Sequence, residues 1–291
     1  MTVSTMCSPL AQMTPISLGE LTEVAALQTR VDRKYVARAE DLDGLIAQVE
    51  TEARVLQIGQ IRCFAYESVY FDTPNLTSYM LAARRRRRRF KVRTRTYLDS
   101  SQCWLEVKTR GPRGSTVKNR LPYECSDRAA LAPGRWFVDS TLTNESIKNS
   151  EEMPLLPTLV TRYHRTTLFL PSTTSRATID TELSWQDRDG RWMEVPGLAI
   201  VETKTGSTAS GLDRILWASG HRPARISKFA TGLAALHPEL PVGRWRRTLR
   251  QHFATAEFTL PDGPDTDGPQ AGGCAWTSAT ERIGEQVGSM A

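Results

Sequence analysis

Basic and acidic side chains alternate with apolar ones between Lys91 and Lys108. Arg93 and Arg95 fall on one face of an extended strand, and Glu106 and Lys108 fall on one face of the next. Arginine offers phosphate two parallel hydrogen bonds, and lysine adds a compact positive charge. Carboxylates among such cations would repel phosphate unless Mg²⁺ or Mn²⁺ lay between them. The pattern therefore predicts a site for a phosphate-rich anion and a divalent metal.

Mixed charges at strand spacing recur at residues 30–34, 176–180 and 200–204. The pair Glu202 and Lys204 repeats the spacing of Glu106 and Lys108. The alternate residues are largely apolar or small, so the opposite faces can pack against an outer layer of helices. Buried charge is costly unless it is paired or holds a ligand. We therefore expect the ionic faces to line an interior or a groove that binds a ligand.

Strands and helices are predicted around these stretches to position them. From their β-branched and aromatic content, further strands are predicted at 66–71, 157–170, 175–185 and 190–206. From apolar spacing and capping residues, helices are predicted at 38–53, with about three turns, and at 210–220 and 224–238, with a helical or irregular link at 76–83. The stretch 127–157 is expected to be helical or irregular, with Trp136 and Phe137 as its anchors.

The chain of 291 residues is long enough to bury a large core. A loose leader is predicted over residues 1–19, because they show no sustained period. The main domain is predicted over 20–240 and a basic helical extension over 241–260. Residues 261–291 are rich in Gly, Pro, Asp and Ser, so a disordered tail is expected there.

The composition limits the partners and the compartment. A net charge of +6, from 38 basic and 32 acidic residues, indicates an anionic partner without identifying it. Five cysteines without a C-x-x-C pair indicate neither a disulfide framework nor a zinc site, and are typical of reduced thiols in a cytoplasmic protein. No apolar run approaches the roughly 20 residues that span a bilayer. Association with a membrane would therefore need a partner.

Basic residues occupy alternate positions from Arg85 to Arg95, which predicts that the strand of Arg93 and Arg95 begins near Arg85. The arginine run at 84–89 also invites a prediction of nucleic-acid binding. A charge run taken alone is usually a solvated face or a loose nucleic-acid contact. Few aromatic residues are interleaved with it or with the basic segment 244–250, so a stacking platform for single strands is missing, and nucleic acid is not the expected partner. We expect Arg84 to Arg88 at the mouth of the ionic interior, where they would attract a polyanion. Because the chain has neither a P-loop nor a G-x-G-x-x-G motif, phosphate must be held by side chains.

Seven short motifs, in order over residues 30–236, carry a family resemblance. The chain resembles the VTC (vacuolar transporter chaperone) domain, the polyphosphate-polymerase branch of the triphosphate tunnel metalloenzyme, or CYTH-like, superfamily. The resemblance implies an α+β fold, an antiparallel eight-stranded β tunnel with helices packed on its outside and ionic faces pointing inward. The motifs are R-V-D-R-K-Y at 30–35, K-V-R-T-R-T-Y at 91–97, L-E-V-K at 105–108, Y-H-R-T at 163–166, R-A-T-I-D at 176–180, V-E-T-K at 201–204 and S-K-F at 227–229.

Residue roles follow from the resemblance where the motifs match. The arginines expected to act in catalysis are Arg93, Arg95, Arg165 and Arg176. The residues expected to bind substrate are Lys34, Lys108 and Lys228, with Lys204, Arg89 and Lys91 added by their place in the alternating stretches. Glu202 matches the metal-binding glutamate, and Glu106 is the next candidate, as a metal ligand or as a residue that orients a lysine.

The resemblance implies metal-dependent transfer of the ATP γ-phosphate to a growing polyphosphate chain, with Mn²⁺ or Mg²⁺ as cofactor. It also implies a separate membrane subunit that draws the product away, with the chain in the cytoplasm or peripheral at a membrane through that partner. The hydrolytic branch opens with E-x-E-x-K, whereas this chain has Arg30-x-Asp32-x-Lys34, which favours the polymerase branch. Two alternatives stay open: a triphosphatase acting on inorganic or nucleoside triphosphate in the same tunnel, and a non-catalytic module that binds polyphosphate or an inositol polyphosphate.

Overall fold

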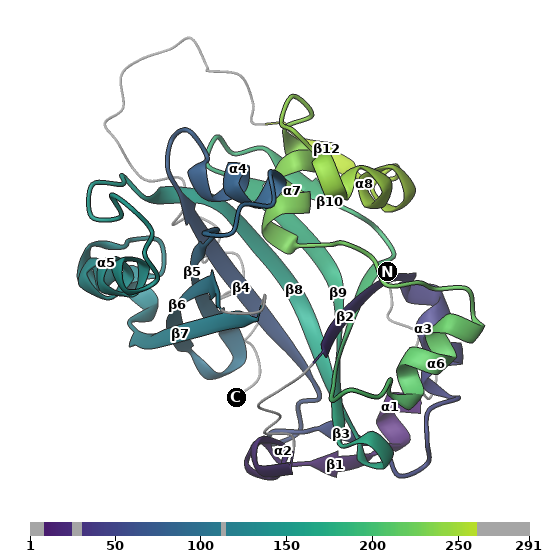
Figure 1. Cartoon of the computed structure of the whole chain (residues 1–291). Coiled ribbons are helices and arrows are strands. Elements are labelled where there is room, and N and C mark those ends of the chain that lie inside the picture. The colour runs from purple at the N-terminus through teal and green to yellow at the C-terminus, as the bar shows by residue number, and fades with distance from the viewer. Residues whose placement is uncertain (1–8, 25–30, 112–114, 261–291) are drawn as a thin grey trace, which may run out of the picture.

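The computed structural model describes residues 9–24, 31–111 and 115–260, and these form an α+β fold built on one large, mostly antiparallel sheet (Figure 1). The expected fold class is confirmed. Eight of its strands pair in a single antiparallel row. In order across the sheet they are β2 (Val31–Arg38), β11 (Leu198–Thr205), β9 (Ser175–Asp187), β8 (Leu156–Leu170), β4 (Cys63–Asp72), β5 (Lys91–Tyr97), β6 (Gln102–Arg110) and β7 (Thr116–Tyr123).

The row of strands curls so that its two halves face each other. Lys34 on β2 lies five strands from β5, yet its charge lowers the pKa values of Lys91 on β5 and Lys108 on β6. Such an effect requires that these side chains approach across the interior. Within residues 31–111 and 115–260 no strand pairing joins β7 to β2, so the interior is not closed by a continuous ladder of hydrogen bonds.

Four short strands add to the sheet beside the long strands β8 and β9. β1 (Thr14–Ile16) pairs in parallel with β3 (Arg54–Leu56), which pairs with β8. β10 (Trp192–Glu194) pairs with β9 and with β12 (Glu257–Thr259). The predicted leader over 1–19 is therefore wrong for residues 9–19, because Ile16 and Leu21 bury their side chains against Leu56 and Phe64. Residues 1–8 lie outside the described residues, as does the predicted disordered tail.

Helices cover the outer face of the curled sheet on two sides (Figure 1). Residues of α3 (Leu42–Ile46) and α6 (Gly211–Ala218) share a core with β2, β8, β9 and β11. On the other side, α5 (Arg135–Asn144) packs with β4, β5 and β6. Its anchors are Val138 and Leu142, which are fully buried, whereas Trp136 is 62% exposed, so the prediction for Trp136 is wrong.

A third group of helices closes one end of the interior. It comprises α4 (Thr77–Ala83), α7 (Lys228–Leu236) and α8 (Arg246–His252), and it shares a core with Tyr70 and Tyr163 of the sheet. Gly232 lets α7 approach the sheet closely, since a Cβ at this position would lie 2.1 Å from the Trp185 ring. The extension 241–260 contains the predicted helix, and it also contributes β12 and packs Trp245 and Phe253 into this core.

The remaining helices are short. The helix predicted within 38–53 is a 3₁₀ turn followed by α3, because backbone bonding of the helical type ends soon after Ile46. The other α-helices are α1 (Pro9–Gln12) and α2 (Leu18–Val24). The 3₁₀ turns are η1 (Ala39–Asp41), η2 (Leu98–Ser100), η4 (Cys125–Asp127), η5 (Ala132–Gly134), η6 (Pro171–Thr173) and η7 (Gly243–Trp245). None of the described helices has both the length and the apolar character needed to cross a membrane.

The arginine run does not extend the strand as its alternation predicts. β5 begins at Lys91, and residues 84–89 form turns in which Arg85 adopts a left-handed conformation with φ of 56°. The backbone leaves α4 through this turn, so it has no straight path into the strand. Arg85 and Arg87 are therefore exposed side chains on a loop rather than members of the strand face.

Candidate active site on the inner face of the curled sheet

Strands β5, β6 and β7 place matching charged residues side by side on the inner face. The register pairs Arg93 with Glu106 and Glu106 with Arg120. Glu106 is 1% exposed and accepts a hydrogen bond from Arg93 Nε at 2.9 Å. Its other carboxylate oxygen lies 3.4 Å from Lys118 Nζ. These cations hold the pKa of Glu106 well below its usual range against the effect of burial, so the carboxylate stays charged.

Strands β2 and β11 place a second carboxylate on the same inner face. Lys34 stands opposite Glu202 in the register, and Lys204 lies on the same face of β11. Glu202 forms ion pairs with Lys204 Nζ at 2.8 Å and with Lys34 Nζ at 3.4 Å. Both lysines lower the pKa of Glu202 despite its burial, and Glu202 in turn raises the pKa of Lys34. Glu202 is thus an ionised oxygen ligand held between two cations.

A third inner-face carboxylate, Asp180, was not among the sequence-predicted site residues. Asp180 is 1% exposed and accepts two hydrogen bonds from Arg165, at 2.6 and 2.8 Å. It also forms an ion pair with Lys228, the first residue of α7. The alternation of Arg176, Thr178 and Asp180 placed it on this face, but its two partners come from distant segments.

The start of α7 is fixed where Lys228 reaches the interior. Ser227 caps the helix by accepting a hydrogen bond from the Ala230 backbone. The carbonyl of Lys228 accepts a hydrogen bond of 2.8 Å from Trp185 Nε1. Ser227 Oγ also accepts a hydrogen bond of 2.7 Å from Lys91 Nζ on β5. The helix predicted at 224–238 is present as α7, which begins at Lys228, and the bond from Lys91 joins its start to the strand that carries Arg93.

Tyrosines form the floor on which several of the cations rest. The Arg165 guanidinium carbon lies 5.2 Å from the Tyr66 ring centre and 5.3 Å from the Tyr163 ring centre. Lys228 Nζ lies 4.2 Å from the Tyr163 ring centre. The Arg95 guanidinium carbon also lies over Tyr66, 5.8 Å from its ring centre. Such cation–π contacts orient the cations without neutralising their charge. The sequence predicts an aromatic strand at 66–71, but it does not predict that tyrosine rings contact the cations.

The inner face carries more positive charge than its carboxylates balance. Burial lowers the pKa of Lys91 to about 7, and burial also lowers those of Lys204 and Lys228 to about 8. Arg93 lowers the pKa of Lys108 well below its usual value. Among the described residues no hydrogen-bond acceptor reaches the buried Nε of Arg95. Such a surplus of buried cations is stabilised by a polyanionic ligand.

The structure brings most of the sequence-predicted site residues together on this face. Arg89 is the exception, because it lies before β5 in the turn that follows the arginine run. The basic residues on the inner face are Lys34, Lys91, Arg93, Arg95, Lys108, Arg165, Arg176, Lys204 and Lys228, joined by Lys118 and Arg120 of β7. The carboxylates are Asp32, Glu106, Asp180 and Glu202.

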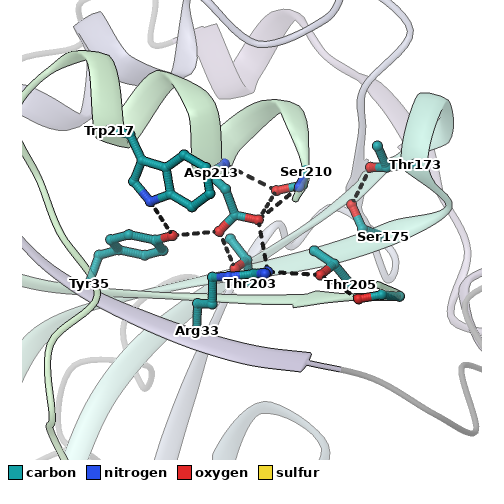
Figure 2. A network of polar contacts seen from close by, with 10 residues as sticks. Arg33, Tyr35, Thr173, Ser175, Thr203, Thr205, Ser210, Asp213 and Trp217 are labelled. Atoms are coloured by element: carbon teal, nitrogen blue, oxygen red, sulfur yellow. Dashed lines mark hydrogen bonds and ion pairs between the residues drawn. The ribbon is translucent and has the colours of Figure 1, made fainter. Parts of the chain in front are cut away.

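A buried polar network on the outer face keeps β2 and β11 in register (Figure 2). Asp213 of α6 accepts hydrogen bonds from Tyr35 Oη at 2.7 Å and from Thr203 Oγ1 at 2.6 Å. Tyr35 follows Lys34 on β2, and Thr203 follows Glu202 on β11. The same carboxylate completes a capping box with Ser210. One side chain on the outside therefore fixes the two strands that present Lys34 and Glu202 inside.

The carboxylates fit a metal ion only when other ligands complete its coordination. Among the described residues no three acidic, histidine or cysteine side chains gather as a metal cage. Glu202 offers an ionised carboxylate whose oxygens keep lone pairs beyond those used by Lys34 and Lys204. Mg²⁺ and Mn²⁺ accept one or two carboxylates together with phosphate oxygens and water. The donor set suits a cation that arrives with a phosphorylated substrate.

Comparisons with known proteins give one family match over most of the chain. The family model described as the VTC domain matches residues 29–237. No curated protein matches the chain.

Solved structures resemble the chain at low identity. A proposed adenylate cyclase from Bacillus halodurans is 14% identical, with a TM-score of 0.45 over 68% of this chain and 94% of that chain. A proposed adenylyl cyclase from Hippeastrum, described as having a dominant triphosphatase activity, is 14% identical, with a TM-score of 0.40 over 71% and 96% of the two chains. The PH1012 protein from Pyrococcus horikoshii OT3 is 11% identical, with a TM-score of 0.37 over 66% and 88% of the two chains.

Proposed function

Since the chain belongs to the VTC domain family, we propose that it is a metal-dependent polyphosphate polymerase. A terminal oxygen of the acceptor phosphate attacks the γ-phosphorus of ATP, and the bond to the β–γ bridging oxygen breaks, so that ADP leaves. No protein nucleophile is required, and catalysis consists of positioning and charge stabilisation. The observation that carries the proposal is the surplus of cations on the inner face, where the buried Nε of Arg95 lacks an acceptor among the described residues and Arg93 lowers the pKa of Lys108.

The arginines on this face have distinct tasks in the proposed reaction. Arg93 and Arg165 are held by buried carboxylates, so they keep a fixed direction and retain N–H groups for phosphate oxygens. Arg95 has a buried and unbonded Nε that can donate to the transferred phosphoryl group. Arg176 extends the same face along β9. Together they would stabilise the negative charge on the three oxygens of the group in transfer.

The lysines would hold the phosphates on either side of the reacting bond. Lys34 and Lys204 flank Glu202, while Lys108 and Lys228 approach from other elements. Glu202 would bind Mn²⁺ or Mg²⁺, which neutralises phosphate charge and orients the γ-phosphate when it is bound. Glu106 is already committed to Arg93 and Lys118, so we propose that it orients cations rather than binding the metal.

Hydrolysis of a triphosphate in the same interior is the second candidate function. It requires a base that can accept a proton from water near neutral pH. Glu106, Asp180 and Glu202 all have pKa values held below their usual range by adjacent cations. They are therefore poor proton acceptors, so none of these three carboxylates suits the role of that base.

The decisive experiment incubates the purified chain with ATP, Mn²⁺ and a short polyphosphate primer. Polyphosphate is followed on gels, and free phosphate is measured in the same samples. We expect polyphosphate from the native chain, and a loss of at least about a hundredfold for Glu202→Gln and Arg95→Ala. Glu67→Gln is the matched control, because Glu67 also pairs with two arginines but lies on the outer face. Free phosphate without polymer would identify a triphosphatase, and binding of polyphosphate without either product would identify a binding module.

We also propose a cytoplasmic location, with a membrane subunit as a separate partner. The support is limited to the free thiols of Cys63, Cys103 and Cys125, which suit a reducing compartment. Co-purification with a membrane fraction, abolished by high salt, would test the partnership. A chain that stays in the soluble fraction at every salt concentration contradicts it.

A further inference from the structure

A pocket lined by arginines lies where the inner face ends. Its volume is about 340 Å³, and its lining consists of Arg85, Arg87, Arg89, Arg110, Arg225 and Arg244. None of the described residues that line it is a carboxylate, so these six positive charges are not balanced by one another. Arginine recognises phosphate oxygens through its planar fork and retains its charge at any physiological pH.

The pocket is assembled from four segments whose positions are fixed by contacts. Arg87 donates a hydrogen bond to the Arg110 carbonyl, which joins the arginine turn to the end of β6. Gly243 approaches the Ala83 carbonyl so closely that a Cβ there would lie 3.2 Å away, and this places Arg244 beside the same turn. Thr248 Oγ1 donates to the Arg225 carbonyl at 3.1 Å, which fixes the segment before α7. These contacts therefore hold the lining segments of the pocket in fixed positions.

The charges in the pocket repel one another and have no carboxylate partner among the described residues. Nε of Arg244 is buried without a hydrogen-bond acceptor among the described residues. Burial and the neighbouring arginines lower the pKa values of Arg89 and Arg244 below their ordinary range. A bound anion with several charges would relieve both the repulsion and the unbonded donor.

The pocket continues the row of basic residues that β5 and β6 place on the inner face. Arg89 stands two residues before Lys91, and Arg110 stands two residues after Lys108, while Lys91 and Lys108 face each other across β5 and β6. Two residues of strand span about 7 Å, so the pocket begins one repeat beyond the last lysine pair. The described lining residues offer no aromatic ring on which a nucleobase would stack. A phosphate chain bound along the inner face can therefore run into the pocket.

We propose that this arginine pocket is a second phosphate-binding subsite, which holds the part of a polyphosphate chain that extends beyond the inner face. Triphosphate is too short to occupy both places, whereas a longer chain occupies both. The subsite would therefore give the protein a preference for long chains. The proposal of a preference in synthesis rests on the proposed polymerase function, but the preference in binding does not.

The test compares the binding of triphosphate and of a size-selected longer polyphosphate, in EDTA and without ATP, so that no turnover occurs. The double variant Arg89→Gln/Arg244→Gln should weaken binding of the longer chain by about tenfold or more, because two charge-assisted contacts are lost, and binding of triphosphate by less than about twofold. The control is Arg214→Gln/Arg247→Gln, which changes the charge equally at two exposed positions outside the pocket. Arg225→Gln, at an exposed lining position, gives a second variant with little risk to folding.

Equal weakening of both ligands, or unchanged binding of the longer chain by both pocket variants, would overturn the subsite. Inositol hexakisphosphate serves as a further probe, since a compact polyanion could use the same arginines. If only its binding falls in the pocket variants, the pocket serves a compact ligand and the proposal fails. A native chain that forms no polymer, yet shows the expected difference in binding, would remove the polymerase function and leave the subsite standing.

Discussion

Replacing Asp180 with asparagine tests whether the inner face is built for an anion. Asp180 is 1% exposed and balances Arg165 and Lys228, whose side chains are each 12% exposed. Removing one partner of a buried ion pair costs about 3–5 kcal/mol. Burial already lowers the pKa of Lys228 to about 8, so this lysine can release its proton, and we expect the lower end of that range. A loss of about 3 kcal/mol lowers the Tm of a domain of this size by roughly 10 °C.

The same substitution should strengthen the binding of an anion. Asp180→Asn leaves Arg165, and Lys228 in its protonated form, without their carboxylate, so triphosphate would supply the missing negative charge. We expect triphosphate to bind Asp180→Asn at least about fivefold more tightly than the native chain, which corresponds to about 1 kcal/mol. Thermal unfolding measures the loss of stability, and calorimetric titration in EDTA measures the affinity. Both are independent of turnover.

Glu67→Gln provides the matched control for this prediction. Glu67 is 8% exposed and accepts from Arg128 at 3.1 Å and from Arg162 at 2.8 Å, but on the outer face of β4. It should lose stability without gaining affinity for triphosphate. If Asp180→Asn loses stability and binds triphosphate no more tightly, Asp180 has a structural role only, and the reasoning from uncompensated cations is refuted.

Three further predictions follow from the site. The affinity for triphosphate should fall as the pH rises from 8 to 10, because the pKa of Lys228 is lowered to about 8 and only its protonated form attracts the anion. Calorimetry should show a weaker dependence of affinity on pH for Lys228→Arg, and an unchanged dependence would contradict the role of Lys228. Mn²⁺ should bind the free chain weakly and the triphosphate complex tightly, since the described residues hold no cage of acidic ligands; tight binding of Mn²⁺ alone, detected by electron paramagnetic resonance, would refute this. Asp213→Asn should destabilise the fold by about 2–3 kcal/mol through the loss of charge-assisted bonds from Tyr35 and Thr203, and an unchanged urea midpoint would show that the network does not hold β2 to β11.

The sequence by itself determined which charged residues share a face. Alternation fixes the direction of side chains along a strand, and turns fix which strands are neighbours. The shared face of Arg93 and Arg95 and the shared face of Glu202 and Lys204 followed from spacing alone and are present in the structure. Their roles in phosphate transfer remain proposals.

Predictions from local sequence patterns were wrong where neighbouring elements determine the path of the backbone. The alternation of basic residues from Arg85 predicted a strand, but the chain leaves α4 through a left-handed turn and the strand begins only at Lys91. Trp136 was expected to anchor α5, yet the helix turns Val138 and Leu142 toward the sheet. Residue type alone does not encode the direction in which the chain leaves α4 or the face that α5 turns toward the sheet.

Tertiary structure alone decided how the charges are paired and which are left over. Asp180 meets Lys228 across 48 residues of sequence, because Gly232 allows α7 to close on Trp185. The arginine pocket likewise joins residues of the run at 84–89 with Arg110, Arg225 and Arg244. Pairing across such separations depends on how the sheet curls and where helices pack, which a period of two or of 3.6 residues does not encode. The sequence therefore determined the chemistry of this face, and the fold determined its arrangement.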